Sequence, residues 1–284
     1  MIYLIALLLG LVQGLCEFLP VSSSGHLFLI RTLTRDAVGE GTFGSFFTVM
    51  LHVATLIAVV IVYREQVLAI LKKPFQKLTL HLILATLPTV VVALILKKFD
   101  ALDAWLDQGN LVGFCFLLTA VFLTVCELCG RRAGKKKRPL KDMRVSDALL
   151  IGGMQAIGVL PGVSRSGSTI TGARLSGLSR KAAADFSFLL SIPAILGGLV
   201  LEVYKLVKHP DAVGAMNAVS YWVALTLAML VAAISGYFAV RFMIRLITKK
   251  GLWGFAIYTA ALGALVLLCQ GFGWLGFGFT PFGG

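Results

Sequence analysis

Acidic residues are scarce in this sequence: Asp and Glu together number 13, against 26 Lys and Arg, and the formal net charge is +13. Such an excess of positive charge can indicate binding to nucleic acid. The chain is also strongly apolar, with a mean hydropathy of +0.91 and 58% hydrophobic residues, above the roughly 45–50% of soluble proteins. In membrane proteins, Lys and Arg gather in cytoplasmic loops and set the orientation. We therefore expect a polytopic membrane protein that binds no nucleic acid.

The sequence also lacks the marks of a zinc site and of a cleaved leader. Cys126 and Cys129 have the spacing of half a zinc site, but no second pair accompanies them. We expect them to be small apolar residues at a helix end. The apolar run at residues 1–19 has no charged n-region and no small-x-small cleavage motif. We expect this run to remain in the protein.

Long apolar runs dominate the chain, and several approach the roughly 20 residues that are needed to cross a bilayer. The six expected spans are residues 46–63, 80–96, 111–128, 186–206, 221–242 and 252–270. Residues 1–33 and 147–178 are apolar too, but Gly, Pro and Ser interrupt them. Irregular backbone at membrane depth survives only where protein or a water-filled cavity satisfies it. These two segments are therefore predicted to be re-entrant helical hairpins.

The prediction is an all-α polytopic membrane protein that forms a single membrane domain over residues 1–284, with one re-entrant hairpin and three transmembrane helices in each half. The predicted parts are repeat one at 1–129, a basic cytoplasmic loop at 130–146, repeat two at 147–270, and a tail at 271–284. Three spans is an odd number, so the second half enters the membrane from the opposite side. This is an inverted-topology repeat, an arrangement common in transporters.

Basic residues predict the orientation. The loops 64–79, 130–145 and 241–250 hold four, eight and four Lys or Arg, and all three fall on one side of the predicted topology. That side should be cytoplasmic. The first hairpin then enters from the outer face and the second from the cytoplasm. Their tips can meet near the middle of the membrane.

Two polar motifs echo each other at an interval of 142 residues, half of the 284-residue chain. Gln13 lies 12 positions before Gly25, and Gln155 lies 12 positions before Gly167. Val-Ser-x-Ser-Gly closes both motifs, at residues 21–25 and 163–167. Internal duplication of this kind places polar chemistry at matching points of two halves.

Glu17 and His26 belong to the first motif. Ionisable groups within a membrane are costly and are therefore functional candidates. Gln13 and Glu17 are spaced i, i+4, on one helix face. Their oxygens suit a hard divalent cation, Mg²⁺ or Ca²⁺, whose shell waters and phosphate oxygens would complete. The alternative is a pair that only hydrogen-bonds the hairpin turn.

The Ser run at residues 22–24 resembles an anion-binding nest at the start of a helix, where the positive end of the dipole faces the ligand. In isolation such a run also fits an ordinary turn. A Ser hydroxyl near His26 can be activated as a nucleophile. Alternatively, His26 itself attacks phosphorus, protonates a leaving group, or only caps the turn.

The second motif adds a fixed positive charge. Arg165 can grip phosphate oxygens with two parallel hydrogen bonds. Ser164, Ser166, Ser168 and Thr169 offer hydroxyl and N–H donors to the same anion. A purely structural role explains a single Arg at a membrane-embedded turn poorly.

Residues 13–26 (Gln-Gly-Leu-Cys-Glu-Phe-Leu-Pro-Val-Ser-Ser-Ser-Gly-His) together with 161–169 (Pro-Gly-Val-Ser-Arg-Ser-Gly-Ser-Thr) closely resemble the undecaprenyl-pyrophosphate phosphatase family. This is the integral-membrane type linked to bacitracin resistance. The resemblance implies hydrolysis of the C55 isoprenoid pyrophosphate to the monophosphate and inorganic phosphate, which recycles the cell-wall lipid carrier. It also implies a divalent metal and an inverted-repeat fold with re-entrant hairpins. We expect the protein in the bacterial plasma (inner) membrane, with an active site opening to the outer, periplasmic face. A homodimer is a further expectation.

The resemblance carries roles over to individual residues. It implies that Ser23, His26 and Glu17 are catalytic and that Glu17 and Gln13 bind the metal. Gln13 stands where some members have Glu, which leaves Glu17 as the only carboxylate there. The implied phosphate ligands are Ser22, Ser24, Ser164, Arg165, Ser166 and Thr169.

Two questions stay open at this point. The nucleophile can be Ser23, His26 or water. The chain can also be a transporter or flippase for a polyprenyl phosphate, since inverted repeats with hairpins at the midplane are transporter architecture. Glu17 and His26 beside the Ser run favour the enzyme, because binding alone needs no base. An ion channel is disfavoured, because one Arg and one Glu do not form a ring of like charges.

Overall fold

The computed structural model describes residues 1–39, 42–131, 137–208 and 218–274. This part of the chain is helical and has no β-strand beyond one isolated bridge between Arg138 and Leu178. Six of its helices are long and apolar enough to cross a membrane: α3 (Ser45–Val62), α5 (Lys77–Leu96), α7 (Val112–Arg131), α10 (Arg180–Lys208), α11 (Val219–Lys249) and α12 (Trp253–Phe272). The prediction of an all-α polytopic membrane protein is confirmed.

Each expected span overlaps one of these six helices, but some helices extend past the apolar run. The apolar run at 221–242 lies within α11, which continues to Lys249. Hydropathy detects only the stretch that suits lipid, whereas helical hydrogen bonding continues through the charged residues that follow. The short connecting helices are α4 (Arg64–Lys72), α6 (Asp100–Asp107) and the 3₁₀ turn η1 (Leu140–Asp142).

The two interrupted segments form pairs of short helices. The first pair is α1 (Ile2–Phe18) and α2 (Ser23–Val38), and the second is α8 (Val145–Ile157) and α9 (Arg165–Leu175). Ser22 caps α2 by accepting a hydrogen bond from the N–H of Gly25 at 3.2 Å, and Ser164 caps α9 in the same way from Gly167 at 3.1 Å. The matching motifs therefore produce matching helix starts.

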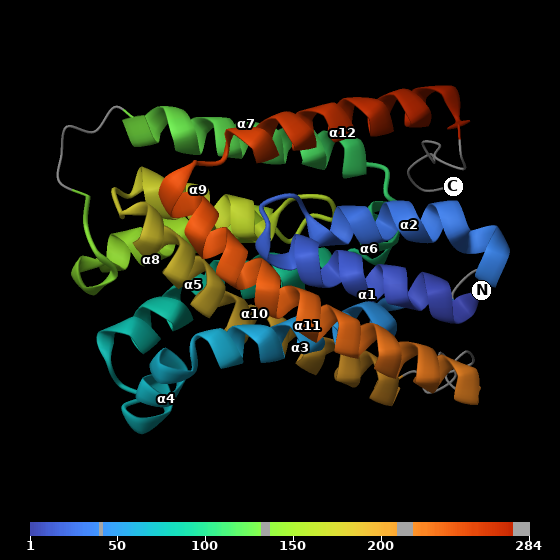
Figure 1. Cartoon of the computed structure of the whole chain (residues 1–284), viewed down its shortest axis with the longest axis horizontal. Helices are drawn as coiled ribbons and strands as arrows, with labels where there is room; N and C mark the ends of the chain where they lie inside the picture. Colours follow the sequence, from blue (N-terminus) through green and yellow to red (C-terminus); the bar gives the residue numbers. More distant parts are fainter. Residues whose placement is uncertain (40–41, 132–136, 209–217, 275–284) are drawn as a thin grey trace.

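The two hairpin tips meet inside the bundle. In Figure 1, α1 runs inward from the end that holds the N-terminus, and α8 runs inward from the opposite end. The Gly162 N–H donates to Ser24 Oγ at 3.2 Å, and Ser166 Oγ donates to the Leu19 carbonyl at 3.2 Å. Hydrogen bonds from segments about 140 residues apart thus join the tips.

Helices of each half pack against helices of the other half. Helix α1 packs on α11 and α8 packs on α5, while α3 contacts α11 and α10 contacts α5. Helices α4, the start of α8 and the α11–α12 junction lie at one end of the molecule, on the left in Figure 1. This pairing is what a two-fold relation between the halves would produce. The inverted topology and its domain boundaries stay predictions.

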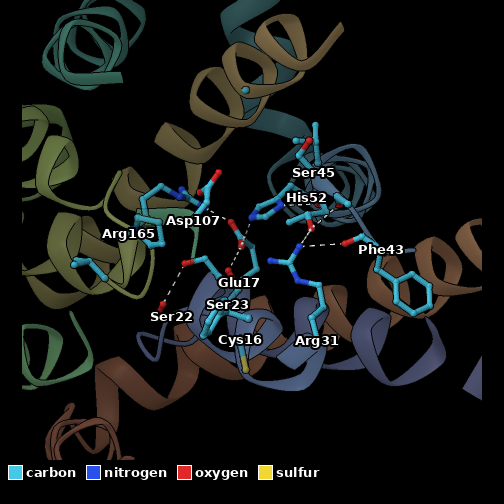
Figure 2. Close-up of a pocket in the computed structure, with 18 of the residues that line it drawn as sticks. Cys16, Glu17, Ser22, Ser23, Arg31, Phe43, Ser45, His52, Asp107 and Arg165 are labelled. Atoms are coloured by element: carbon cyan, nitrogen blue, oxygen red, sulfur yellow. Dashed lines mark hydrogen bonds and ion pairs between the residues drawn. The ribbon is translucent and has the colours of Figure 1, made fainter. Parts of the chain in front are cut away.

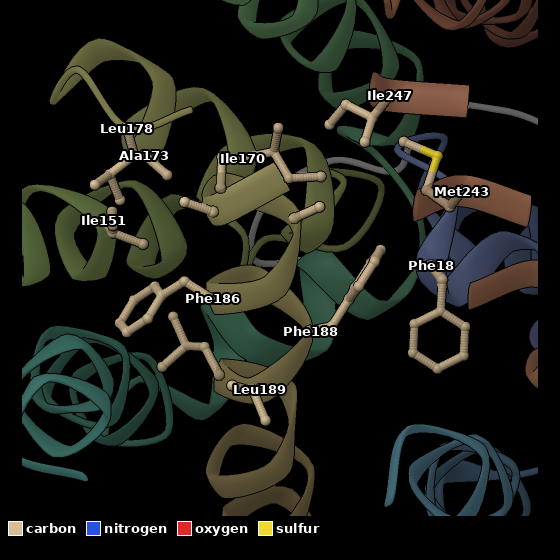
Figure 3. Packing of buried hydrophobic residues seen from close by; sticks show 14 of the residues in the cluster. Phe18, Ile151, Ile170, Ala173, Leu178, Phe186, Phe188, Leu189, Met243 and Ile247 are labelled. Atoms are coloured by element: carbon tan, nitrogen blue, oxygen red, sulfur yellow. The ribbon is translucent and has the colours of Figure 1, made fainter. Parts of the chain in front are cut away.

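The largest apolar cluster lies where the second hairpin packs on α10, and Figure 3 shows its centre. Phe186, Phe188 and Ile170 are fully or almost fully buried there. Phe18, the last residue of α1, meets Phe188 edge to face with ring centroids 5.7 Å apart. This contact ties the first hairpin to the core of the second half and so fixes the depth of its tip.

Glycines bring the backbones of α1 and α11 close together. A Cβ atom at Gly10 would lie 2.3 Å from the carbonyl oxygen of Ala228, and one at Gly14 would lie 1.9 Å from Ser235 Oγ. Both distances are far shorter than van der Waals contact. The position of α1 therefore depends on these two missing side chains.

Gly10→Ala should destabilise the protein by about 1–3 kcal/mol, because the added methyl group forces the two backbones apart. The apparent melting temperature in detergent measures this. Gly153→Ala is the matched control: apart from its chain neighbours and the backbone of its own helix, no atom of the described residues lies within 4 Å of its added Cβ, and helix propensity predicts a gain of up to about 1 kcal/mol. Equal stability of the two variants would contradict the close packing of α1 on α11.

Candidate active site

A cavity of about 1130 Å³ opens between the two hairpin tips and α3. Seven of the residues singled out in the sequence line it: Glu17, Ser22, Ser23, Ser24, Gln155, Ser164 and Arg165. Five others do not: Gln13, His26, Ser166, Ser168 and Thr169. Figure 2 shows Glu17 near the centre of the view, with Ser23, His52, Arg31 and Arg165 around it.

Glu17 joins the two halves of the site. Its side chain is 4% exposed, and its Oε1 forms an ion pair with Arg165 Nη2 from the other hairpin. Its Oε2 accepts hydrogen bonds from Ser23 Oγ at 2.6 Å and from Gln13 Nε2 at 3.0 Å. The structure therefore brings Gln13, Glu17, Ser23 and Arg165 into one connected group.

Local structure explains how these side chains reach the cavity. Gln13 and Glu17 are four residues apart near the end of α1, so both lie on one face. Ser23 is the first residue of α2 and Arg165 the first of α9. The starts of both helices line the cavity, and the backbone N–H groups of a helix start attract anions.

The backbone turn before α2 is sharp. Ser22 has a φ of 69°, and it is the only residue other than Gly with a positive φ in the ranges that the structure describes. Such a conformation costs of order 1–3 kcal/mol and persists where its surroundings enforce it. Here the Ser22 side chain caps Gly25, and the turn presents Ser23 to Glu17.

Ser166 and Thr169 are turned toward protein groups. Ser166 Oγ donates to Leu19 and also lies 3.2 Å from Ser164 Oγ. Thr169 Oγ1 donates to the Arg165 carbonyl at 2.9 Å and lies 2.6 Å from Ser187 Oγ on α10. In this structure they brace the second tip, and their part in binding phosphate stays a prediction.

His26 lies outside the cavity lining. Its Nδ1 is 2.7 Å from the Ser22 carbonyl oxygen, and its Nε2 is 2.7 Å from the hydroxyl of Tyr258 on α12. A carbonyl only accepts, so Nδ1 carries a hydrogen, and in the neutral ring Nε2 accepts from Tyr258. The Ser23 hydroxyl instead donates a hydrogen bond to Glu17. A base role for His26 toward Ser23 stays a prediction and requires the ring to release at least one of these two partners.

The sequence analysis did not identify His52 on α3 as a residue of the site. Its Nε2 lies 3.4 Å from Glu17 Oε2, and its Nδ1 lies 2.8 Å from the Thr48 carbonyl oxygen. The signal was available: Thr48, His52 and Thr55 place polar groups at helical spacing on one face of an otherwise apolar run. That face points at the cavity and Glu17.

Comparison with known proteins identifies the family. A family model described as "Bacitracin resistance protein BacA" matches residues 6–265. The chain belongs to the BacA family. It is 40% identical over 268 residues to the undecaprenyl-diphosphatase of Carboxydothermus hydrogenoformans and to undecaprenyl-diphosphatase 3 of Bacillus cereus, covering 94% of this chain and 97% of each relative. It is 37% identical over 286 residues to the undecaprenyl-diphosphatase of Alkaliphilus metalliredigens, covering 93% and 97%. The resemblance is confirmed.

The divalent cation stays a prediction, and the residues at this site are compatible only with a cation that takes few ligands from the protein. Within the described part of the chain, no three His, Cys, Asp or Glu side chains gather closely enough to hold a metal. The Gln13 Oε1 atom, however, is buried and has no hydrogen-bond partner there. Glu17 and Gln13 thus offer two oxygens, and Mg²⁺ commonly binds one or two protein groups plus waters and phosphate oxygens.

The contact between Glu17 and Arg165 should be a strongly coupled pair. Glu17→Gln or Arg165→Met alone leaves one buried charge without its partner, and we expect each to cost about 3–5 kcal/mol. The double variant should cost less than the sum by about 0.5–3 kcal/mol. Equilibrium unfolding in mixed micelles measures all three. Additive effects would mean that the two charges do not interact.

Proposed function

We propose that this protein hydrolyses undecaprenyl pyrophosphate to undecaprenyl phosphate and inorganic phosphate. This reaction recycles the lipid carrier of cell-wall synthesis and confers resistance to bacitracin. The main support is that Glu17 contacts both the Ser23 hydroxyl and Arg165, in a cavity lined by the starts of two helices. Membership of the BacA family, with relatives named undecaprenyl-diphosphatase, supports the substrate.

The pyrophosphate head group binds between the two tips. Arg165 shares its guanidinium with the terminal phosphate, and the N–H groups at the starts of α2 and α9 surround the same oxygens. Fixed donors of this kind stabilise the charge that develops in phosphoryl transfer. The prenyl chain stays in the bilayer.

Ser23 then attacks the terminal phosphorus. A bond forms between Ser23 Oγ and phosphorus, the bridging P–O bond breaks, and undecaprenyl phosphate leaves with the electron pair. Glu17, which already accepts the hydrogen bond from Ser23, takes the proton. Water next attacks the phosphoserine, releases inorganic phosphate and restores the hydroxyl. His26 as base, His26 as nucleophile and direct attack by water remain the alternatives.

A divalent cation, Mg²⁺ or Ca²⁺, is part of this proposal. Glu17 and Gln13 would hold it, and it would neutralise charge on the phosphate oxygens. The unpartnered Gln13 Oε1 supports this ligand set.

We place the protein in the bacterial plasma (inner) membrane, with the cavity opening to the periplasmic face. The three basic loops support this orientation, because the helices they join meet at the end opposite the N-terminus (Figure 1). A homodimer stays an expectation, which the oligomeric state in detergent will test.

Phosphate release from a prenyl pyrophosphate by the purified protein tests the function. Wild-type protein should release phosphate, and Ser23→Ala should reduce kcat by at least about 100-fold, because the attacking oxygen is lost. Ser176→Ala is the control: among the residues that the structure describes, its hydroxyl hydrogen-bonds only to the Ala173 carbonyl, at the far end of α9. Release that survives in Ser23→Ala would move the attack to His26 or water. No release from folded wild-type protein would favour the transporter or flippase.

Metal dependence should follow the number of carboxylates. EDTA should abolish phosphate release, and Mg²⁺ should restore it. Gln13→Glu adds a second carboxylate beside Glu17, so half-maximal activity should need about 10-fold less Mg²⁺. Gln13→Leu should need more. An unchanged Mg²⁺ requirement in both variants would remove Gln13 from the metal site.

A further inference from the structure

The cavity contains a second Arg that the proposed reaction does not use. Arg31 lines the cavity from α2, and Figure 2 shows it on the other side of Glu17 from Arg165 in that view. Arg165 forms an ion pair with Glu17, and Arg35, also in the lining, pairs with Asp36. Across the described ranges, Arg31 forms no ion pair with a carboxylate within 4.0 Å. Its charge therefore has no directly bound counter-ion.

Neutral oxygens hold Arg31 in place. Its Nη1 donates to the Phe43 carbonyl at 3.1 Å and to Thr48 Oγ1 at 3.3 Å. Its Nε and Nη2 form no hydrogen bond to any residue that the structure describes. Asp107 at the end of α6 also lines the cavity and attracts Arg31 from a longer distance. The guanidinium is thus anchored at one nitrogen and can receive an anion at the others.

Arg31 is within reach of the reacting groups. It follows Ser23 by eight residues, about 12 Å along α2, and helical side chains lean back toward the N-terminus. Its anchor Thr48 lies one turn before His52, which contacts Glu17. Measured along α3, the Arg31 guanidinium therefore lies roughly one helical turn, about 5.4 Å, from the position of the Glu17 carboxylate.

We propose that Arg31 forms a second phosphate subsite, which makes the cavity selective for a diphosphate over a monophosphate. Arg165 and the helix starts hold the phosphate that Ser23 attacks, and Arg31 holds the phosphate that stays on the lipid. A half-buried cation without a bound counter-ion is costly, and the second phosphate removes this cost. The roles of the two phosphates rest on the proposed function, but diphosphate binding itself does not.

Binding of soluble anions tests the subsite without turnover. The probes are imidodiphosphate, a diphosphate with a non-hydrolysable bridge, and inorganic phosphate, and the readout is the ligand-dependent rise in melting temperature of the full-length protein in detergent. Arg31→Gln should weaken imidodiphosphate binding by about 10- to 100-fold and change phosphate binding by less than about 3-fold. With a prenyl pyrophosphate, KM should rise while kcat stays nearly constant, because the contact exists in both ground and transition states.

Arg35→Gln is the matched control, since it removes the same charge from the same helix and lines the same cavity. It should change the binding of either anion by less than about 3-fold. Equal losses for the two anions in Arg31→Gln, or equal losses in both variants, would overturn the subsite and leave only a general electrostatic effect. Unchanged imidodiphosphate binding in Arg31→Gln would also overturn it.

Arg31→Lys decides the matter if Arg31→Gln does not fold. It keeps the charge but loses the planar fork, so imidodiphosphate binding should weaken by about 3- to 10-fold while phosphate binding stays unchanged. Wild-type affinity in Arg31→Lys would then overturn the subsite. Wild-type protein that binds imidodiphosphate but releases no phosphate from a prenyl pyrophosphate would refute the proposed function. The subsite would then remain supported.

Discussion

The ion pair between Glu17 and Arg165 is the contact on which the site depends. Each charge comes from a short helix of a different half, and neither is accessible enough to be solvated by water alone. A buried charge is tolerated only with a well-placed partner, so the two tips must meet. Their meeting requires α1 to pack on α11 and α8 on α5, and it requires Phe18 to reach Phe188. The packing of the bundle and the geometry of the site therefore depend on each other.

The helix starts add a field that no side chain supplies. Ser22 and Ser164 each satisfy one backbone N–H group, and the Ser164 N–H donates to Thr119 Oγ1. N–H groups of a first helical turn that have no such partner attract anions. Because the cavity lies among apolar helices, these dipoles act in a medium that screens them less than water does. Glu17 balances part of this positive field in the structure. The polar groups are arranged in advance, so binding an anion requires little reorganisation.

Much of this arrangement could be predicted from the sequence, because it depends on local patterns. Hydropathy located the six long helices, and the i, i+4 spacing placed Gln13 beside Glu17. The partners of His52 and Tyr258 could not be predicted in this way. His52 meets Glu17 only because α3 packs beside α1, and Tyr258 reaches His26 from a helix 232 residues away. The direction of the His26 ring is set by that distant hydroxyl, and no local pattern encodes it.

The contacts of Glu17 also explain how the site can select its ligand. Both oxygens of the carboxylate are in use: Arg165 binds one, and Ser23 and Gln13 bind the other. An entering anion must therefore compete with Glu17 for Arg165. An anion with a single negative charge gains little by displacing Glu17, because its attraction to Arg165 is about the same as that of the carboxylate it replaces. A phosphate with two negative charges gains more, since Coulomb attraction scales with charge. The ion pair that joins the two tips would thus also discriminate among head groups by their charge.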